Sequence, residues 1–242
     1  MILPLRTNHF MERANQYGDL LFETMLFEGN EIRFANFHFE RLIKGLEILK
    51  MPKPFLSIEE FLEIARQAAI FGLNQNPYES KLRIRFTAKR NGLGNYLPIN
   101  PQIIYETSVQ PILSKNNKFL TLGIYPEQVK APGILANLKT GNALIYIMSA
   151  IYAKENNWDE ALILNTFGNI IESTSSNIFW FKNNQWYTPP LSEGCIEGVG
   201  RRVFMESHPV IEMPCTLTDL QTAEQRLLTN ALFLHREFIL NP

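Results

Sequence analysis

Residues 20–34 have the sequence LLFETMLFEGNEIRF, in which an apolar run meets a turn and a shorter second run. The pattern predicts a strand over residues 20–27 and a return strand over residues 31–34. The three residues between them, Glu28-Gly29-Asn30, favour the tight turn of a β-hairpin. The chain therefore begins its sheet with an antiparallel pair.

Helices and further strands follow this hairpin without an internal repeat. Apolar residues spaced three or four apart from Phe39 to Leu49 predict a helix, which Pro52 and Pro54 end. A capping box at Ser57 to Glu60 predicts a second helix through about Phe71. Further helices are predicted over residues 141–155 and 198–207, and further strands over residues 81–87, 102–109, 119–125, 160–165 and 170–181. Because hairpins outnumber strand–helix–strand crossovers, the predicted class is α+β with mostly antiparallel sheets.

One strand carries an unusual amount of positive charge. In residues 81–87, Leu82, Ile84 and Phe86 alternate with basic or polar residues that include Arg83 and Arg85. Since alternate side chains point to opposite faces of a sheet, one face of this strand is predicted to face water or a polar cavity.

A polar, turn-rich stretch divides the chain near its middle. Its 242 residues are enough for one or two domains, and residues 110–117, QPILSKNN, have the composition of a linker. The predicted division is an N-terminal α/β lobe over residues 1–109, a linker over residues 110–117 and a C-terminal lobe over residues 118–242.

Composition excludes several classes of protein. A hydrophobic fraction of 45% and a charged fraction of 19% exclude a disordered chain, and a net charge of -1 argues against a nucleic-acid partner. Two cysteines and four histidines, without the spacing of a zinc site, predict no metal. No apolar run is long enough to cross a bilayer or to form a signal peptide, so a soluble cytoplasmic protein is expected.

Four features suggest chemistry when they are taken together. Lys139 lies at the start of a predicted helix, where the positive field favours a neutral amine; an ordinary surface lysine is the alternative. Glu172 has apolar flanks, so it is either a buried carboxylate that needs a cation or donor, or an exposed strand residue. The glycine-rich residues 194–200 lead into a helix whose N-terminus can bind an anion, and Arg41 can add a cation there. A lysine, a carboxylate and a phosphate site are the groups that pyridoxal 5′-phosphate requires.

In order and spacing, the motifs of this chain resemble those of fold-type IV (class IV) pyridoxal-phosphate enzymes, which include branched-chain and D-amino-acid aminotransferases and 4-amino-4-deoxychorismate lyases. The resemblance runs from about Tyr17 to Leu234. It is carried by the stretches around Phe22-Glu23-Thr24, His38 to Leu42, Lys139 to Leu144, Asp159 to Leu162, Glu172 to Phe179, Tyr187 to Leu191, Gly198 to Arg201 and Thr229 to Leu232.

The resemblance implies a fold and a role for each matching residue. The fold is that of D-amino-acid aminotransferase, two lobes with the cofactor between them, built as a homodimer. Lys139 forms the Schiff base and moves the proton, and Glu172 pairs with the ring nitrogen. The phosphate is bound by Arg41, by the backbone of Val199 and Gly200, and by Asn230. Many transaminases of the family have threonine at the position of Gly200, so cofactor affinity here is expected to be lower.

The resemblance favours one reaction and leaves another open. Thr24 is a candidate acid–base or substrate-positioning group typical of the lyases, although a threonine chosen for strand propensity is the alternative. Leu93 stands where lyases often have a carboxylate-binding arginine, and the candidates to replace it are Arg83, Arg85, Lys89 and Arg90. The favoured prediction is a lyase that converts 4-amino-4-deoxychorismate, a small amine, to 4-aminobenzoate and pyruvate for folate synthesis. The alternatives are a branched-chain or D-amino-acid transaminase and an inactive binding protein.

Overall fold

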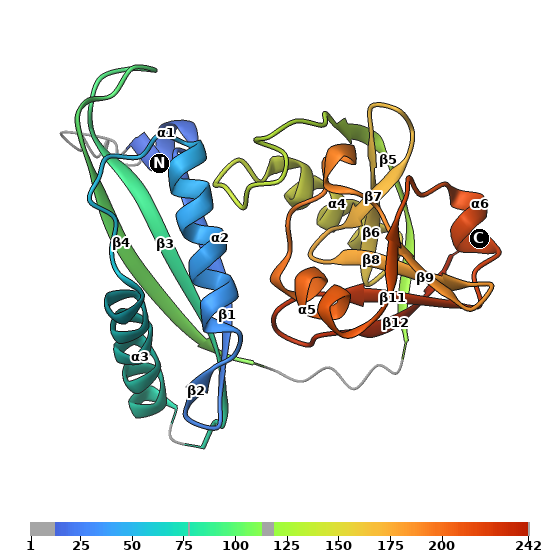
Figure 1. The fold of residues 1–242 in the computed structure, drawn as a ribbon, viewed down its shortest axis with the longest axis horizontal. Helices are drawn as coiled ribbons and strands as arrows, with labels where there is room; N and C mark the ends of the chain where they lie inside the picture. Colours follow the sequence, from blue (N-terminus) through green and yellow to red (C-terminus); the bar gives the residue numbers. More distant parts are fainter. Residues whose placement is uncertain (1–12, 77, 113–118, 242) are drawn as a thin grey trace, which may run out of the picture.

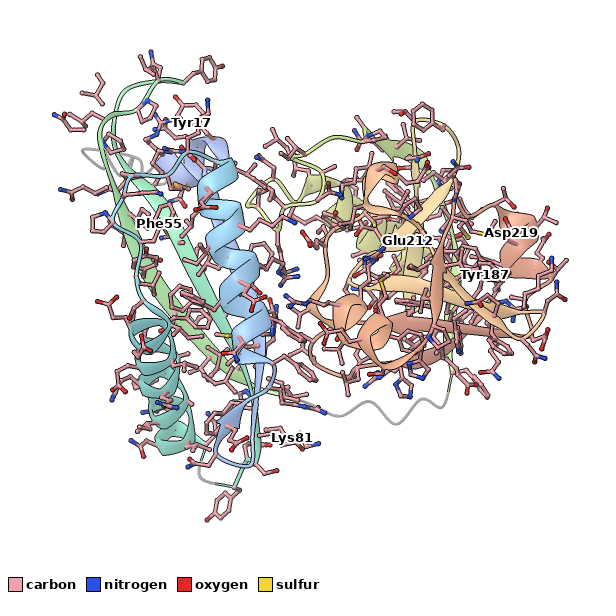
Figure 2. All side chains as sticks on the ribbon, in the orientation of Figure 1. Tyr17, Phe55, Lys81, Tyr187, Glu212 and Asp219 are labelled. Carbon is pink, nitrogen blue, oxygen red and sulfur yellow. The ribbon has the colours of Figure 1, made fainter. Side chains whose placement is uncertain are left out.

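The structure, a computed structural model, describes residues 13–76, 78–112 and 119–241 and has two lobes (Figure 1). The N-terminal lobe contains a four-stranded sheet in the order β2-β1-β3-β4. Its elements are α1 (Arg13–Tyr17), β1 (Leu20–Glu28), β2 (Glu31–Ile32), α2 (Ala35–Ile48), α3 (Ile58–Gln75), β3 (Lys81–Leu93) and β4 (Ile99–Pro111). Tyr17 and Lys81 lie near opposite ends of this lobe (Figure 2).

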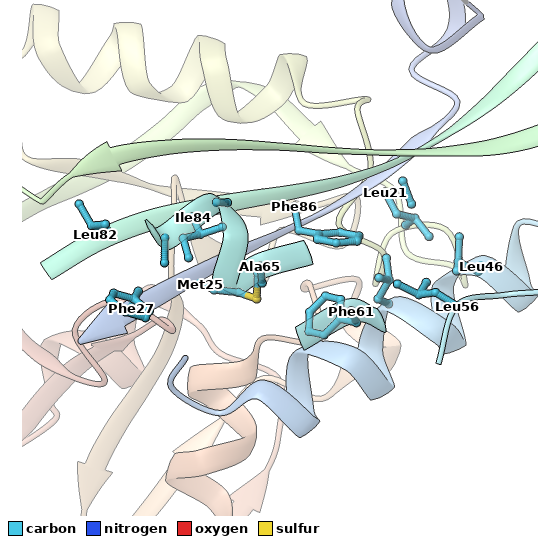
Figure 3. Packing of buried hydrophobic residues seen from close by; sticks show 14 of the residues in the cluster. Leu21, Met25, Phe27, Leu46, Leu56, Phe61, Ala65, Leu82, Ile84 and Phe86 are labelled. Carbon is cyan, nitrogen blue, oxygen red and sulfur yellow. The ribbon is translucent and has the colours of Figure 1, made fainter. Parts of the chain in front are cut away.

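Alternation along two strands separates the core of this lobe from its outer face. Leu21 and Met25 on β1, and Ile84 and Phe86 on β3, are buried against residues of α2 and α3 (Figure 3). Phe61 of α3 packs against Phe86 with ring centroids 4.9 Å apart. The intervening residues of both strands point to the other face of the sheet, because side chains alternate along a strand.

The C-terminal lobe contains an eight-stranded sheet in the order β10-β9-β8-β11-β12-β5-β6-β7. Three of its pairs are parallel, β5 with β6, β5 with β12 and β9 with β10, and the other pairs of the described residues are antiparallel. Its elements are β5 (Leu120–Lys130), α4 (Leu144–Glu155), β6 (Glu160–Asn165), β7 (Ile170–Ser173), β8 (Asn177–Lys182), β9 (Gln185–Thr188), η1 (Leu191–Glu193), α5 (Val199–Ser207), β10 (Val210–Glu212), α6 (Leu217–Gln221), β11 (Gln225–Thr229) and β12 (Arg236–Leu240).

Local sequence signals placed several elements well. The hairpin of β1 and β2 is confirmed, with Glu28 opposite Glu31. The capping box is also confirmed: Ser57 and Glu60 exchange side-chain and backbone hydrogen bonds at the start of α3, which extends four residues beyond the predicted end, to Gln75.

Other predictions differ from the structure, and β2 and β3 end at Ile32 and Leu93 instead of residues 34 and 87. The single strand predicted over residues 170–181 is two strands, because a turn closed by the Ser173 N–H and the Ser176 carbonyl separates β7 from β8. Helix α4 begins at Leu144, so Lys139 lies in the preceding loop and not at the helix terminus. The linker was predicted to begin at Gln110, but β4 continues to Pro111 because its backbone still pairs with β3. Residues 113–117 of the predicted linker lie outside the described residues.

The two lobes meet along α2. Strand β1 also contacts the loop before α4, since the Phe22 N–H donates to the Lys139 carbonyl at 3.0 Å and the Gly141 N–H donates to the Leu20 carbonyl at 3.1 Å. Gly141 is needed for this approach, because a Cβ there would lie 3.1 Å from the Cα of Gly18. Among the described helices, none is long and apolar enough to cross a membrane.

Candidate active site

A cavity of about 460 Å³ lies between the two lobes. Residues from β1, α2 and β3 of the N-terminal lobe line one side, and loops of the C-terminal lobe line the other. Six of the residues predicted from sequence line it, each from a separate part of the chain: Thr24, Arg41, Lys139, Glu172, Val199 and Asn230. The seventh, Gly200, packs directly behind Asn230.

Lys139 is buried beside the cavity and has an unusually acidic ammonium. Burial and the charge of Arg41 lower the pKa of Lys139 to about 8, although Glu23 and Glu172 act in the opposite direction. Its Nζ lies 4.5 Å from the centroid of the Phe22 ring. The cause differs from the predicted helix field, because α4 begins five residues later and desolvation is the larger effect. A pKa of 8 instead of 10.5 raises the neutral fraction at pH 7 by about 300-fold, which makes this amine a better nucleophile.

Glu172 is buried and accepts hydrogen bonds from three parts of the C-terminal lobe. Its Oε1 accepts from Lys130 Nζ at 2.7 Å and from the Tyr146 hydroxyl at 2.8 Å, and its Oε2 accepts from the Ile196 N–H at 2.9 Å. Burial and Glu172 raise the pKa of the Tyr146 hydroxyl, so it stays a neutral donor. The sequence predicted a buried carboxylate that needs a cation or donor; here Lys130 supplies the cation.

Arg41 is held in place by the buried carboxylate of Glu23. Its Nε donates to Glu23 Oε1 at 2.8 Å, its Nη2 donates to Glu23 Oε2, and its Nη1 donates to the Glu197 carbonyl at 3.0 Å. His38 Nδ1 lies 2.6 Å from Glu23 Oε2. Burial alone would raise the pKa of Glu23, but Arg41 and His38 outweigh it and lower this pKa to about 2. The pair fixes the guanidinium at the edge of the cavity.

The N-terminus of α5 offers free backbone donors on the other side of Arg41. Its N-cap, Gly198, provides no side-chain cap, so the first N–H groups, including those of Val199 and Gly200, lack intrahelical partners. A Cβ on Gly200 would lie 2.6 Å from the backbone of Asn230, so the threonine of many relatives does not fit here. Thr229 also lines the cavity. Its Oγ1 is buried and has no hydrogen-bond partner among the described residues. These groups form a cradle suited to an anion.

Asn230 has a structural task as well. Its Oδ1 accepts from the N–H groups of Leu232 and Phe233 at 2.9 and 3.2 Å, and its Nδ2 donates to Ser176 Oγ at 3.3 Å. It therefore shapes the turn after β11 that packs on the start of α5.

The outer face of the N-terminal sheet supplies two arginines to the cavity. Arg83 and Arg85 line it with Thr24, which stands opposite Arg85 in the β1–β3 pairing. Arg83 Nε is buried without a partner, and Arg85 lies 3.7 Å from the centroid of the Phe22 ring. The predicted polar face of this strand is confirmed.

The other candidates for binding a substrate carboxylate lie elsewhere. Lys89 is paired with Glu106, and Arg90 is bound to Asp19 and to backbone carbonyls of residues 49 and 50. Leu93 is exposed at the end of β3 and does not line the cavity.

Sequence reasoning missed Lys130, Tyr146 and Thr229 as single site residues. Tyr146 interrupts an otherwise apolar helical run, which is a weak signal, and Thr229 was noticed only within a motif. Lys130 has no local signal, because it meets Glu172 only through the pairing of β5 with β6 and of β6 with β7. In the described part of the chain, no cluster of His, Cys, Asp or Glu side chains could hold a metal ion.

Comparison with known proteins places this architecture in a family. The family model described as amino-transferase class IV matches residues 20–237. The chain belongs to the class IV aminotransferase family. The class IV match and the fold together confirm the predicted family and two-lobed α+β fold, and class IV aminotransferases use pyridoxal 5′-phosphate, as predicted.

Relatives of this chain within the class IV aminotransferase family carry more than one activity in their names. A putative branched-chain-amino-acid aminotransferase of Methanocaldococcus jannaschii is 27% identical over 88% of this chain and 75% of its own length. An aminodeoxychorismate lyase of Vibrio harveyi is 25% identical over 91% of this chain and 82% of its own. The PLP-bound form of a hypothetical aminotransferase from Mycobacterium tuberculosis has a TM-score of 0.80 at 18% identity, covering 99% of this chain and 86% of that one.

The residues of the cavity fit the cofactor of this family. A buried amine with a lowered pKa stands where a carbonyl can meet it, an acceptor-only carboxylate lies beside it, and unpaired N–H groups with the orphaned Thr229 hydroxyl can receive a phosphate. When bound, the cofactor supplies an electron sink for negative charge formed on the substrate carbon.

Proposed function

We propose that this member of the class IV aminotransferase family uses pyridoxal 5′-phosphate to convert 4-amino-4-deoxychorismate to 4-aminobenzoate and pyruvate. The observation that carries the proposal is the pair Arg83 and Arg85, which face the cavity with no ion pair of their own among the described residues. This substrate has two carboxylates and one amine. Two unpaired guanidinium groups suit it, since guanidinium binds carboxylate in a charge-assisted, bidentate way.

Arg83 and Arg85 also disfavour the binding of a small apolar substrate in this cavity. A branched-chain side chain gains affinity from apolar contacts, whereas half-buried arginines without an ion pair lose part of their hydration. Burial and the charge of Arg83 already lower the pKa of Arg85, which shows how closely the two cations are held. An incoming dianion relieves this repulsion.

Each residue has a proposed role in this reaction. Lys139 binds the cofactor and takes the proton from the carbon that carries the amine. The bond from the neighbouring carbon to the enolpyruvyl oxygen then breaks; the enol leaves and gains a proton to become pyruvate, and the ring becomes aromatic. Thr24, beside Arg85, positions the enolpyruvyl group or donates this proton. Arg41, the N-terminus of α5 and Asn230 bind the phosphate, and Glu172 faces the ring nitrogen.

Two activities measured on one preparation test the proposal. Protein loaded with the cofactor is supplied with aminodeoxychorismate, and pyruvate and 4-aminobenzoate are quantified. In parallel it is supplied with branched-chain and D-amino acids and a keto-acid acceptor. We expect equimolar pyruvate and 4-aminobenzoate, with slower amino transfer. Amino transfer without 4-aminobenzoate contradicts the proposal and establishes the alternative, a branched-chain or D-amino-acid transaminase, which the names of several relatives favour.

An exposed apolar stripe supports a homodimer. Leu144, Ile147, Met148 and Ile151 lie three or four residues apart on α4 and are exposed. A contiguous exposed apolar stripe is typical of an interface, so α4 of a second copy is its proposed partner. Light scattering after gel filtration should give twice the chain mass of 27.9 kDa, and Ile147→Glu with Ile151→Glu should give one chain. A wild-type monomer contradicts the dimer without touching the proposed reaction.

A further inference from the structure

The carboxylate of Glu172 is nearly saturated by donors of the chain itself. A carboxylate has about four acceptor positions, and Lys130, Tyr146 and the Ile196 N–H occupy three of them. Two are on Oε1 and one is on Oε2, so one position on Oε2 remains for a donor in the cavity.

The three donors come from three separate parts of the chain, which fixes the orientation of the carboxylate. Lys130 ends β5 after a bulge in its pairing with β6, Tyr146 lies in the first turn of α4, and Ile196 precedes α5. Lys130 also donates to the Tyr146 hydroxyl at 2.6 Å. The side chains of Lys130 and Glu172 are 12% and 4% exposed, so solvent screens this pair only weakly.

Lys130 approaches Glu172 from behind the active-site cavity. It lines a neighbouring cavity of about 430 Å³, together with Tyr17, Asp19 and Tyr146, and does not line the site itself. It therefore cannot touch a substrate in the site directly, and any effect on the chemistry has to act through Glu172.

The charges around Glu172 determine how Lys130 affects the chemistry of the site. A protonated heterocyclic nitrogen at the remaining position of Oε2 is a second cation on a carboxylate that already has one. Lys139 is a third cation nearby, and it feels the charge of Glu172. The other titratable group that faces Glu172, Cys195, is neutral because burial and Glu172 raise the pKa of its thiol to about 12. An ammonium at Lys130 thus leaves less of the Glu172 charge to stabilise a ring proton.

We propose that Lys130 is a positioning residue that acts through Glu172 to weaken protonation of the cofactor's ring nitrogen, with Tyr146 and the Ile196 N–H fixing the carboxylate geometry. The effect is one of charge: a neutral residue at position 130 strengthens ring protonation, and an arginine there preserves the wild-type state. It rests on the proposed contact of Glu172 with the ring nitrogen, and it applies to lyase and transaminase chemistry alike.

Binding of two cofactors measures this effect without any turnover. Dissociation constants are determined for pyridoxal 5′-phosphate and for the analogue with carbon in place of the ring nitrogen, and their ratio isolates the interaction at that nitrogen. Relative to wild type, the ratio should change about tenfold in favour of the natural cofactor in Lys130→Met. It should stay within about twofold in Lys130→Arg and in Tyr146→Phe, which removes a donor without removing charge. An unchanged ratio in Lys130→Met, or an equal change in Tyr146→Phe, overturns the proposal.

A second measurement follows the protonation of the ring nitrogen itself. The ¹⁵N chemical shift of ring-labelled cofactor reports protonation of the nitrogen directly. The pH midpoint of this shift should be about one unit higher in Lys130→Met than in wild type and unchanged in Lys130→Arg. Equal midpoints in Lys130→Met and wild type overturn the proposal.

Discussion

Arg41 and Glu23 are joined through two hydrogen bonds, from Nε to Oε1 at 2.8 Å and from Nη2 to Oε2, beneath the edge of the active-site cavity. The carboxylate is 2% exposed, and His38 approaches it on the other side. This arrangement aims the guanidinium at the N-terminus of α5, where the phosphate is proposed to bind. Glu23 is thus a positioning residue for Arg41.

Replacement of Glu23 by glutamine should destabilise the protein in a pH-dependent way. Its pKa is about 2 in the fold and 4.5 ordinarily, so the carboxylate contributes stability above pH 4.5 that is lost as the pH falls toward 2. At pH 7 we expect Glu23→Gln to lose about 3 kcal/mol in the free energy of unfolding. Urea unfolding of the cofactor-free proteins at several pH values checks this. A deficit that does not shrink below pH 4.5 contradicts it.

Replacement of Lys139 by methionine should instead increase the free energy of unfolding at neutral pH. Burial lowers the pKa of Lys139 from 10.5 to about 8, so the unfolded chain binds more protons between these values and stability rises with pH there. Below pH 8 the buried ammonium costs about 3 kcal/mol. In cofactor-free protein, Lys139→Met should therefore be more stable than wild type at pH 7, and the difference should decrease toward pH 10.5. Equal stability differences at pH 7 and pH 10 contradict the burial of this ammonium.

Arg83 and Arg85 should affect substrate binding more than turnover. Arg83→Gln and Arg85→Gln each remove one proposed carboxylate contact, so KM for aminodeoxychorismate should rise about tenfold to a hundredfold, with a smaller change in kcat. The matched control is Arg66→Gln, which removes an exposed arginine of α3. An unchanged KM in both cavity variants contradicts the proposal that these two side chains recognise the substrate.

Gly200 should not tolerate even a methyl group. A Cβ there would lie 2.6 Å from the backbone of Asn230, so α5 would have to move away from the turn after β11. We expect Gly200→Ala to lose about 1 to 3 kcal/mol of stability and to bind the cofactor more weakly. Glu206→Ala, at an exposed position of the same helix, is the control. Wild-type cofactor affinity in Gly200→Ala refutes the close packing.

The parts of the fold that sequence predicted are those with local causes. The turn at Gly29 and the capping box at Ser57 depend on neighbours within four residues, and both are confirmed. The break between β7 and β8 was missed because the apolar flanks of residues 170–181 obscured a serine-rich turn. The start of α4 was misplaced because no capping side chain marks it.

The residues of the site also fall into those that sequence motifs predicted and those that only the fold brings together. The seven residues predicted from motifs all lie at or directly beside the cavity, some on strands and helices and others, such as Lys139 and Asn230, in the loops that join them. The contact of Lys130 with Glu172 joins residues 42 positions apart, on strands β5 and β7 that both pair with β6. Nothing in the sequence around Lys130 indicates that pairing, so only the three-dimensional structure could reveal it.

Chemical reduction of the cofactor-loaded protein tests the central claim most directly. Borohydride should fix the cofactor covalently to one lysine, and peptide mapping should find it on Lys139, with no label in Lys139→Ala. Lys130 lies in the same region and serves as an internal comparison. A label on Lys130 or another lysine, or no label in wild type, contradicts the account.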